Sequence, residues 1–344
     1  MNDPIYYKQY MKNVKRLITI CLLVFLTFNI WSKPLPTQSK HTIIIDTDCA
    51  IDDLRAISLL LARPEITVKA ILLSDGSLAP NEGYGKVKAL LHEFKCDTIP
   101  VGCGETIKGI NPPWRPFVRQ ISWGTSTEQQ VSEIKAVDLL YEKLNHTTGK
   151  ITLVCLGALT NVYRLIQKDV SITSKIERIV WYNESIKPLQ GFNYECDKTA
   201  AEAAFKSGIR IDVISNLQKE GTTLDTAFYN VCKNSQTNLS RILYNVHSQP
   251  AVLERLNRHH FRLCDDLLSV YITNPELFDI NTSKDNVRVR YNQDYNVASV
   301  KEAIFDMIKG TYVVGKNIVF NDFPRERELF TYDVRQIMDS AIAR

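Results

Sequence analysis

The segment His41-Thr-Ile-Ile-Ile-Asp-Thr-Asp-Cys-Ala-Ile-Asp-Asp53 joins an apolar run to a cluster of four carboxylates. The uninterrupted β-branched residues 42–45 are typical of a strand that is buried on both faces of a parallel sheet. The next residues, 54–62, carry apolar side chains at helical spacing, so the acids lie in a strand-to-helix turn. In open α/β folds such turns lie at the carboxyl edge of the sheet, where ligands bind.

The four acids are Asp46, Asp48, Asp52 and Asp53, and no Lys or Arg lies among them. Like charges this close repel strongly unless a cation neutralises them. Asp52 could instead be the N-cap of the following helix, and Asp53 in its first turn would complement the helix dipole. Asp46 and Asp48 lack such an explanation and point to the same side of the strand. Because oxygen-only ligands favour Ca²⁺ or Mg²⁺, we expect a hard-cation site here.

The 344-residue chain is long enough for one large α/β domain or two smaller ones. Its net charge of +4 comes from the first 40 residues, because the remainder holds 36 basic and 37 acidic residues. No basic stripe or stacking-aromatic motif is present, so no nucleic-acid partner is expected. The seven cysteines after residue 40 lack C-x-x-C spacing, and we expect most of them to be small buried hydrophobes.

Residues 1–40 have the organisation of a signal peptide. Lys12, Lys15 and Arg16 precede an apolar run of 15 residues, 17–31, and a polar segment with two prolines follows. The run is short for a membrane-spanning helix, although an uncleaved anchor would also fit. We therefore expect export to a periplasm or out of the cell, and membrane attachment only if the segment stays uncleaved.

The rest of the chain alternates between strand, turn and helix patterns, which is typical of an α/β fold. We predict strands over 67–73, 99–103, 150–156, 176–181 and 209–214, helices over 82–94, 130–144 and 198–207, a mostly helical region over 226–258, and a late hairpin over 286–299. Trp114, Phe117 and Trp123 fall in a long irregular connection and could line a pocket.

The pattern Asp46-x-Asp48-x-x-x-Asp52-Asp53 after an apolar strand resembles the amino-terminal signature of the inosine-uridine-preferring nucleoside hydrolase family. Gly157-Ala-Leu-Thr-Asn161 resembles the family's Gly-Pro-Leu-Thr-Asn segment, and Gly191-Phe-Asn193 stands where the family has Glu-Phe-Asn. The segment 265–278 resembles the family's carboxyl-terminal motif. These resemblances follow the family's order from about residue 42 to residue 278. They imply a single α/β domain over residues 41–344 with a Rossmann-like, mostly parallel sheet flanked by helices.

The resemblance implies Ca²⁺-dependent hydrolysis of the N-glycosidic bond of a small-molecule ribonucleoside or related N-riboside, which releases base and ribose. The metal ligands that it implies are Asp48, Asp53, Asp265 and the backbone carbonyl of Leu156. Asp48 would also take the proton of the attacking water. The implied substrate contacts are Asp52, Asn193, Asp265 and, in place of the family's upstream Asn, Asn183. Asp46 would support the cluster from behind the ligands.

The chain departs from the family pattern at three places. Cys49-Ala50 replaces Pro-Gly in the acidic turn, where Gly permits backbone conformations that Ala resists. Gly191 replaces the Glu that would grip the ribose, and Glu195 could substitute for it only if the loop is rearranged. Cys264 stands where many members place a His that protonates the leaving base. His260, one helical turn earlier, is the other candidate for this acid.

Two other functions fit parts of the pattern. A DxD phosphatase of the haloacid dehalogenase type would use Asp46 as nucleophile and Asp48 as acid over Mg²⁺, but it leaves Asp265 unexplained. A non-catalytic exported protein that binds calcium and a ribosyl group would explain all three departures from the family. Both remain open from the sequence, as does a homo-oligomeric state.

Overall fold

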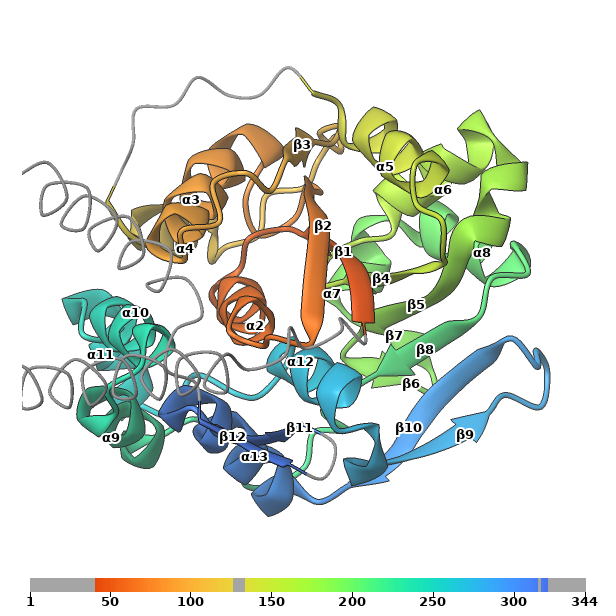
Figure 1. Cartoon of the computed structure of the whole chain (residues 1–344). Helices are drawn as coiled ribbons and strands as arrows, with labels where there is room; N and C mark the ends of the chain where they lie inside the picture. Colours follow the sequence, from red (N-terminus) through yellow and green to blue (C-terminus); the bar gives the residue numbers. More distant parts are fainter. Residues whose placement is uncertain (1–40, 126–133, 315–316, 321–344) are drawn as a thin grey trace, which may run out of the picture. The chain divides into compact units, whose positions relative to one another are not determined.

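An eight-stranded sheet forms the centre of the computed structural model, which describes residues 41–125, 134–314 and 317–320 (Figure 1). The predicted signal segment, residues 1–40, lies outside the described residues. The strands of the sheet lie in the order β3-β2-β1-β4-β5-β8-β10-β9. Their bounds are β1 His41–Thr47, β2 Ile66–Leu73, β3 Val101–Cys103, β4 Ile151–Cys155, β5 Ile176–Tyr182, β8 Ile211–Ile214, β9 Phe278–Thr282 and β10 Val289–Tyr295.

All neighbouring strands of this sheet are parallel except β9, which pairs antiparallel with β10. The predicted mostly parallel, Rossmann-like sheet is therefore confirmed. The chain runs outward from β1 through β2 to β3 and then returns to the other side of β1 as β4. The strand order thus reverses between β1 and β4, and the carboxyl ends of these two strands flank the crevice where such sheets bind ligands.

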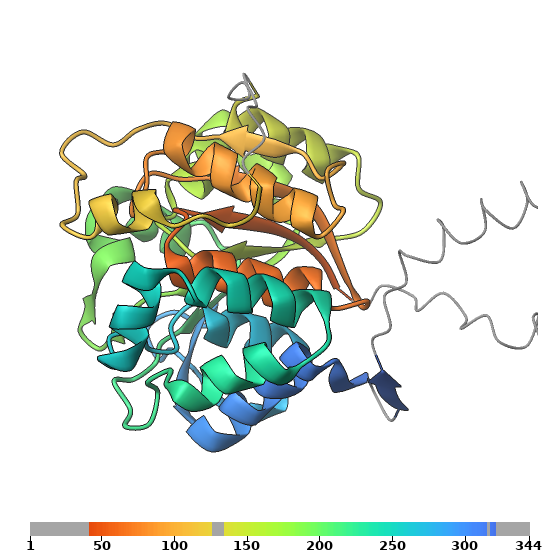
Figure 2. The ribbon, with the colours of Figure 1, turned by 90° about the vertical axis from the view of Figure 1, so that its left-hand side faces the viewer.

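Helices cover both faces of the sheet (Figures 1 and 2). The helices α5 Ala136–Asn145, α6 Thr160–Lys168 and α8 Lys198–Lys206 pack on one face. The other face is covered by α2 Ile51–Leu61, α3 Pro80–Glu93, α4 Arg115–Gln120, α9 Thr226–Asn234, α10 Asn238–His247, α11 Pro250–Asn257, α12 Asp266–Thr273 and α13 Val297–Lys309. The remaining elements are the short helix α7 Phe192–Cys196, the 3₁₀ helices η1 Val170–Lys175 and η2 Pro275–Leu277, and two small hairpins. The hairpins are β6–β7, Ser185–Ile186 with Leu189–Gln190, and β11–β12, Thr311–Val314 with Asn317–Phe320.

The strand β1 is buried on both faces, as its sequence predicts. Ile43 and Ile45 pack in the core beneath α2, whereas Ile44 packs in the opposite core beneath α5 and α6. All three side chains are at most 1% exposed. In this central position β1 holds the acidic turn rigidly at the carboxyl edge. The seven cysteines after residue 40 are free thiols, five of them buried.

Some sequence predictions about element ends are wrong. The helix predicted over 130–144 corresponds to α5, which begins only at Ala136, and residues 130–133 lie outside the described residues. The late hairpin runs from β9 to β10, residues 278–295, and Val297 already begins α13, with the side chain of Asn296 accepting from Ser299 N. Pairing of β10 with β8 on its other side fixes this register, which a local pattern does not reveal. The N-cap of α2 is Ala50 rather than Asp52. Within the described residues, no helix is both long and apolar enough to cross a membrane.

Candidate active site

A cavity of about 390 Å³ opens at the carboxyl ends of β1, β4 and β5. The N–H of Leu156, just past β4, donates to Asp46 O at 2.8 Å and so aligns the ends of β1 and β4. The polar residues that line the cavity are Asp48, Asp52, Asp53, Arg55, Ser77, Tyr182, Glu184, Asn193, Arg255, His260, Arg262, Cys264 and Asp265. Most of the predicted site residues therefore meet here, although they are up to 217 positions apart in the sequence.

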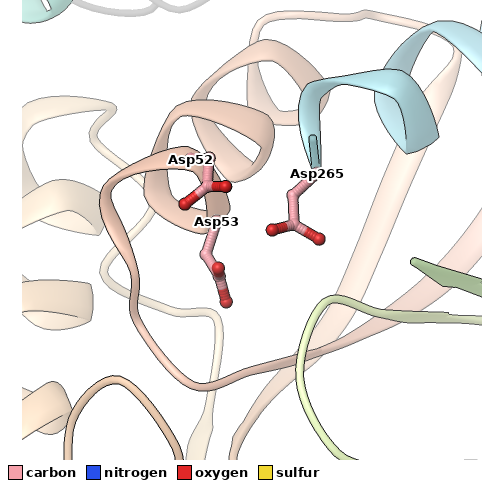
Figure 3. A group of neighbouring side chains, drawn as sticks. All are labelled: Asp52, Asp53 and Asp265. Atoms are coloured by element: carbon pink, nitrogen blue, oxygen red, sulfur yellow. The ribbon is translucent and has the colours of Figure 1, made fainter. Parts of the chain in front are cut away.

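Three carboxylates form the tightest group in this cavity (Figure 3). Asp52 and Asp53 project from the first turn of α2, and Asp265 directly precedes α12. One oxygen of each lies within 4.8 Å of an oxygen of the other two. Asp48 lines the same cavity outside this tight group. Of the predicted metal ligands, Asp53 and Asp265 thus belong to the tight group, Asp48 and Leu156 line the same cavity, and Asp52, predicted as a substrate contact, joins the group.

The turn that presents these acids follows an unusual backbone path. Cys49 adopts a left-handed conformation with φ +63°, whereas Ala50 is extended at φ −61° and ψ 168°. The unfavourable backbone conformation expected at Ala50 is therefore found at Cys49 instead. The Cys49 N–H donates to Thr47 Oγ1 at 2.9 Å, which stabilises the turn. Thr47 Oγ1 in turn donates to Asp53 Oδ2 at 2.6 Å and fixes that carboxylate.

Two glycines make room for the Asp48 side chain. A Cβ atom on Gly76 would collide with the Asp48 carboxylate, and one on Gly157 would lie 3.1 Å from Asp48 Cβ. Gly157 begins the segment that resembles the family's Gly-Pro-Leu-Thr-Asn motif, so this close approach explains why the motif needs Gly at that position. Asp48 is thereby packed deeply at the base of the cavity and is almost fully buried.

Burial raises the pKa of every carboxyl group in this cluster. The pKa values of Asp46 and Asp48 rise to about 7, chiefly by burial and secondarily through the charges of neighbouring carboxylates. The pKa values of Asp53 and Asp265 rise well above their usual value for the same two reasons. Among the described residues, no Lys or Arg forms an ion pair with these acids. The protein alone therefore disfavours their ionised forms.

The nearest guanidinium group, that of Arg55, is already engaged. Its Nε and Nη2 atoms donate to the two oxygens of Asp266, both at 2.6 Å, and both side chains are buried. This bidentate pair joins α2 to α12 and holds Asp265, the preceding residue, beside Asp52 and Asp53. This ion pair was not predicted from the sequence, although two adjacent acids at the start of a helix, Asp265 and Asp266, indicated that one of them could have a basic partner.

These residues fit a hard cation. Their donors are carboxylate oxygens, and Asp265 Oδ1 is buried without a hydrogen-bond partner. The Leu156 carbonyl, which also lines the cavity, accepts from Asn193 Nδ2 at 2.7 Å. A carbonyl oxygen has two lone pairs, so it can still coordinate a metal ion. An ion here would neutralise charges that no basic side chain of the described chain neutralises.

Asp46 and Asn193 stabilise the cavity in different ways. Asp46 lies behind it, where Asn161 Nδ2 donates to its Oδ2 at 3.1 Å and also to Leu73 O at 3.2 Å. This position matches the predicted supporting role. Asn193 lines the cavity, and its Nδ2 donates to the Leu156 and Tyr182 carbonyls at 2.7 and 3.1 Å. The Oδ1 atom of Asn193 is left to accept a hydrogen bond from a ligand.

Asn183 does not line the cavity, in contrast to its predicted role as a substrate contact. Its Nδ2 donates to the Ser185 and Gln190 carbonyls at 2.7 and 2.9 Å, and its Oδ1 accepts from Tyr194 N at 3.2 Å. Because the side-chain amide is fully used within the loop, Asn183 fixes the loop that carries Asn193 instead of binding a ligand itself.

His260 and Cys264 both line the cavity, but they are not one helical turn apart. The chain between α11 and α12 is extended, and Arg262 forms an antiparallel bridge with Thr223. The predicted helical relation is therefore wrong. His260 is exposed at the cavity rim, whereas burial and the charge of Asp52 raise the pKa of the Cys264 thiol. The Tyr182 hydroxyl is buried beside this thiol, and burial together with the neighbouring thiol raises its pKa.

Aromatic rings form one wall of the cavity. Trp114 and Phe192 meet edge to face with ring centroids 4.8 Å apart, and Trp114 Nε1 donates to Ser77 Oγ at 3.0 Å. The Arg255 guanidinium lies 3.6 Å from the centroid of Phe117. Trp114 and Phe117 thus line the predicted pocket, whereas Trp123 lines a different cavity. Arg255, which comes from α11, was not identified from the sequence, because no motif surrounds it.

Comparison with known proteins agrees with this geometry. The model of the inosine-uridine preferring nucleoside hydrolase family matches residues 43–318. The chain belongs to this family. Its similarity to a probable uridine nucleosidase 2 of rice is 30% identity over 193 residues, which cover 52% of the chain and 57% of that relative. A pyrimidine-specific ribonucleoside hydrolase, RihA, of Shewanella sp. strain ANA-3 is also 30% identical, over 50% of the chain and 58% of its own length. The chain thus spans little more than half the length of these relatives.

Solved nucleoside hydrolases share the fold. A purine-preferring ribonucleoside hydrolase from Gardnerella vaginalis superimposes with a TM-score of 0.67 at 18% identity, over 78% of the chain and 98% of that structure. An inosine-uridine preferring nucleoside hydrolase from Bacillus anthracis gives 0.66 at 18% identity, with 78% and 99% covered. At this level of identity the likeness demonstrates the common architecture of the nucleoside hydrolases.

Proposed function

We propose that the protein hydrolyses the N-glycosidic bond of a ribonucleoside or related N-riboside in a Ca²⁺-dependent reaction. The observation that carries this proposal is the group Asp52, Asp53 and Asp265. Their oxygens converge in the switch-point cavity of a nucleoside hydrolase family chain, and none of them forms an ion pair with a Lys or Arg among the described residues. The relatives named as uridine nucleosidase and pyrimidine-specific ribonucleoside hydrolase support a nucleoside as the substrate class.

Oxygen donors and high negative charge favour Ca²⁺ as the ion. Asp48, Asp53, Asp265 and the Leu156 carbonyl would hold it, with Asp52 adjacent. Once bound, the cation supplies the positive charge that keeps these acids ionised and makes a water molecule more acidic. The raised pKa values of the acids in the protein alone are consistent with a site built for a cation, because an ion reverses the penalty of burying the charged forms.

Asp48 is the proposed general base. It lies at the base of the cavity, and the ionised carboxylate that a bound cation would favour can accept a proton from water. Gly76 and Gly157 confine its carboxylate, so its orientation is fixed before substrate binds. Asp46 lies outside the cavity lining and is bonded to Asn161, so its role is to maintain the end of β1.

The remaining residues position and stabilise the sugar. Cleavage of an N-glycosidic bond passes through an oxocarbenium-like transition state, which nearby carboxylates stabilise electrostatically. Asp52 and Asp265 supply such charge, and the free Oδ1 of Asn193 would accept from a ribose hydroxyl. The edge-to-face pair of Trp114 and Phe192 offers an aromatic surface on which a nucleobase would pack.

The DxD phosphatase hypothesis is disfavoured by the position of Asp46. A nucleophile must face the substrate, whereas Asp46 is buried behind the cavity and holds Asn161. The hypothesis of a non-catalytic binder remains the main rival. It shares the cation site and the cavity with the hydrolase, so the two differ only in turnover and must be separated by an assay.

The test begins with calcium-free protein, prepared with a chelator, to which Ca²⁺ or Mg²⁺ is returned. Uridine, cytidine, inosine and adenosine are each added, and free base and reducing sugar are measured. We expect equal amounts of base and ribose with at least one nucleoside, only after Ca²⁺ is returned. Calcium-dependent nucleoside binding without base release would favour the binder, and hydrolysis of p-nitrophenyl phosphate would revive the phosphatase hypothesis.

We also propose that the protein is exported and that residues 41–344 act as one catalytic domain. The basic and apolar segment within residues 1–40 supports export. Fractionation of cells that express the full chain, followed by mass determination of the product, would test both cleavage and location. Recovery of the uncleaved chain in the cytoplasm would contradict the proposal.

A further inference from the structure

The family's ribose-gripping Glu is missing at Gly191, and Glu195 does not replace it. Glu195 lies on α7, forms an ion pair with Lys198 at 2.8 Å and is half-exposed. It is absent from the residues that line the cavity. The carboxylate expected beside Asn193 must therefore come from elsewhere, if the site has one.

Glu184, just after β5, occupies the space beside Gly191. Its Oε2 atom accepts from Phe192 N at 2.8 Å. A Cβ atom on Gly191 would lie 2.5 Å from this same oxygen and 2.9 Å from Glu184 Cβ. Gly191 also adopts φ +131° and ψ 166°, a conformation essentially restricted to glycine. A side chain at position 191 would occupy the space of the Glu184 carboxylate. Glycine at 191 therefore allows Glu184 to adopt this position.

The backbone around Glu184 is firmly anchored. Ser215 Oγ, from the end of β8, donates to Glu184 O at 2.7 Å. The neighbouring Asn183 bonds to the Ser185 and Gln190 carbonyls and to Tyr194 N, which closes the loop that carries both Glu184 and Gly191. The Glu184 carboxylate is therefore held in position before any ligand arrives.

Only one oxygen of this carboxylate accepts a hydrogen bond among the described residues. Glu184 lines the cavity together with Asn193 and Phe192. Within the described part of the chain, its Oε1 atom has no hydrogen-bond donor, and no Lys or Arg forms an ion pair with it. Glu184 and Asn193 thus both line the cavity, and each has an oxygen that accepts no hydrogen bond within the described residues. Such acceptors match the hydroxyl donors of a sugar.

We propose that Glu184 binds a hydroxyl group of the substrate's sugar, in place of the acid that Gly191 lacks. This inference rests on the proposed function, because it concerns the sugar of the same N-riboside. On this proposal Gly191 provides the space that the Glu184 carboxylate occupies. The absence of an acid at position 191 then does not mean that the ribose site has been lost.

The test compares Glu184→Gln with the matched control Glu195→Gln, because both change one carboxylate to an amide in the same loop. For the nucleoside that the wild-type protein cleaves best, we expect kcat/KM to fall about 10- to 100-fold in Glu184→Gln, the usual range for losing a charge-assisted hydrogen bond. We expect Glu195→Gln to stay within about twofold of wild type. An unchanged kcat/KM in Glu184→Gln would overturn the inference.

Deoxynucleosides separate a direct contact from a structural effect. The 2′-, 3′- and 5′-deoxy forms of that nucleoside are assayed with both proteins. If Glu184 binds one hydroxyl, Glu184→Gln lowers kcat/KM for the two deoxynucleosides that keep this hydroxyl. For the deoxynucleoside that lacks it, kcat/KM of the variant stays within about twofold of the wild-type value. An equal fall for all three would overturn the inference. Gly191→Ala should reproduce the same selectivity, because its Cβ displaces Glu184, and should add little in the Glu184→Gln background.

A wild-type protein without hydrolysis would contradict the proposed function but would still test Glu184. In that case ribose is titrated calorimetrically into the calcium-loaded wild-type protein and into Glu184→Gln. Binding that is about 10-fold or more weaker in the variant would support the inference. Equal affinity, or no binding of ribose to either protein, would overturn it.

Discussion

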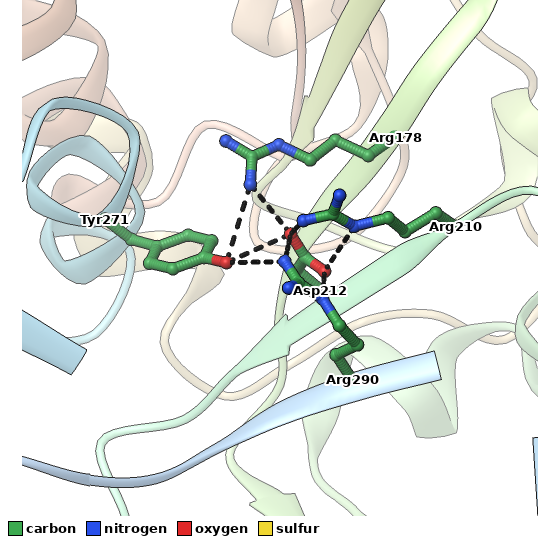
Figure 4. A network of polar contacts seen from close by, with 5 residues as sticks. All are labelled: Arg178, Arg210, Asp212, Tyr271 and Arg290. Atoms are coloured by element: carbon green, nitrogen blue, oxygen red, sulfur yellow. Dashed lines mark hydrogen bonds and ion pairs between the residues drawn. The ribbon is translucent and has the colours of Figure 1, made fainter. Parts of the chain in front are cut away.

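Asp212 and the acids of the cavity are buried carboxylates in opposite surroundings. Asp212, near the amino edge of the sheet, is enclosed by three guanidinium groups and a hydroxyl (Figure 4). Its hydrogen-bond partners are Arg290 at 2.7 and 2.8 Å, Arg178 at 2.8 Å, Arg210 at 3.3 Å and Tyr271 Oη at 3.0 Å. Asp52, Asp53 and Asp265, at the carboxyl edge, have carboxylates as neighbours and no ion pair among the described residues.

The pKa values follow this difference. Burial acts to raise the pKa of Asp212, but the hydrogen bonds and charges of Arg290 and Arg210 outweigh it and lower the pKa. At the cavity, burial and neighbouring carboxylates both raise the pKa values of Asp53 and Asp265. The chain thus completes the charge balance of Asp212 itself. The negative charge of the acids at the ligand-binding edge has no such partner, so a bound cation would have to neutralise it.

The largest expected effect is on cation binding. Asp53→Ala and Asp265→Ala should each weaken Ca²⁺ binding more than about 100-fold, because each removes a charged ligand. Wild-type protein should gain about 2.7 kcal/mol of stability at a Ca²⁺ concentration 100 times the Kd, and both variants should lose this gain. Thermal melts with and without Ca²⁺, combined with metal analysis, measure this. A wild-type protein that neither contains nor responds to Ca²⁺ would refute the cation site.

A comparably large effect is expected on turnover. Asp48→Asn keeps the shape of the side chain but cannot accept a proton from water, so kcat should fall more than about 100-fold with the fold intact. The rate is measured at saturating Ca²⁺, since the variant is expected to bind the ion less tightly. Retention of more than a few per cent of the wild-type rate would show that Asp48 is not the base.

The next effect is on stability at the opposite edge. Asp212→Asn leaves three guanidinium groups without their shared carboxylate, which should destabilise the protein by about 3 kcal/mol because the arginines are partly solvated. The loss should be the same with and without Ca²⁺, in contrast to Asp265→Ala. Urea unfolding with and without Ca²⁺ measures this loss of stability. A loss that depends on Ca²⁺ would show that Asp212 is coupled to the cation site at the opposite edge.

The two regions should also respond oppositely to pH in calcium-free protein. Asp46 and Asp48 titrate near 7 when folded, against 3.8 for an ordinary Asp. Between these values the folded state binds more protons than the unfolded state, so their contribution to stability falls as pH rises, by up to about 1.4 kcal/mol per pH unit per group. The pKa of Asp212 is lowered, so its contribution is instead lost as pH falls.

Unfolding free energies of chelator-treated protein from pH 4 to 8 test this prediction. Saturating Ca²⁺ should suppress the loss of stability at the high end, and Asp48→Asn should make the calcium-free curve shallower. A calcium-free protein that becomes steadily more stable from pH 5 to 8 would show that the acids of the cavity do not have raised pKa values.

The smallest effect is expected at Cys264. Its raised pKa keeps the thiol protonated and makes it a weak acid, so Cys264→Ala should change kcat for inosine by no more than about twofold. A riboside with an activated leaving group, p-nitrophenyl riboside, should be cleaved much faster than inosine. A selective loss on inosine in His260→Ala would assign the acid to His260. Equal wild-type turnover of both substrates would refute departure of the base without strong acid assistance.

Local pattern was enough to predict the central fold. The apolar run ending at Asp46, the acids after it and the helical spacing beyond fix β1 and α2, because hydrophobic periodicity and turn chemistry act over a few residues. The meeting of these acids with Asp265 was predicted only through resemblance to a family. Nothing local in the sequence brings residues more than 200 positions apart together.

The errors come from contacts between distant elements. Pairing with β8 drew β10 into the sheet and displaced the predicted hairpin. The bridge between Arg262 and Thr223 kept the segment from His260 to Cys264 extended. Glu184 was missed because its importance depends on the space that Gly191 leaves, and a sequence motif records the missing acid without showing what fills its place.

The left-handed backbone at Cys49 also bears on how this chain could have diverged from its family. Proline is fixed near φ −65° and cannot adopt the +63° of Cys49, so restoring the family's Pro-Gly would require the whole turn to refold. The Cys49 sulfur also lies against Gly83, where a Cβ atom would come within 2.6 Å of it. Replacing Cys49 with Pro alone would therefore disrupt the turn, whereas Ala50, at φ −61° and ψ 168°, could be replaced with Gly without backbone strain.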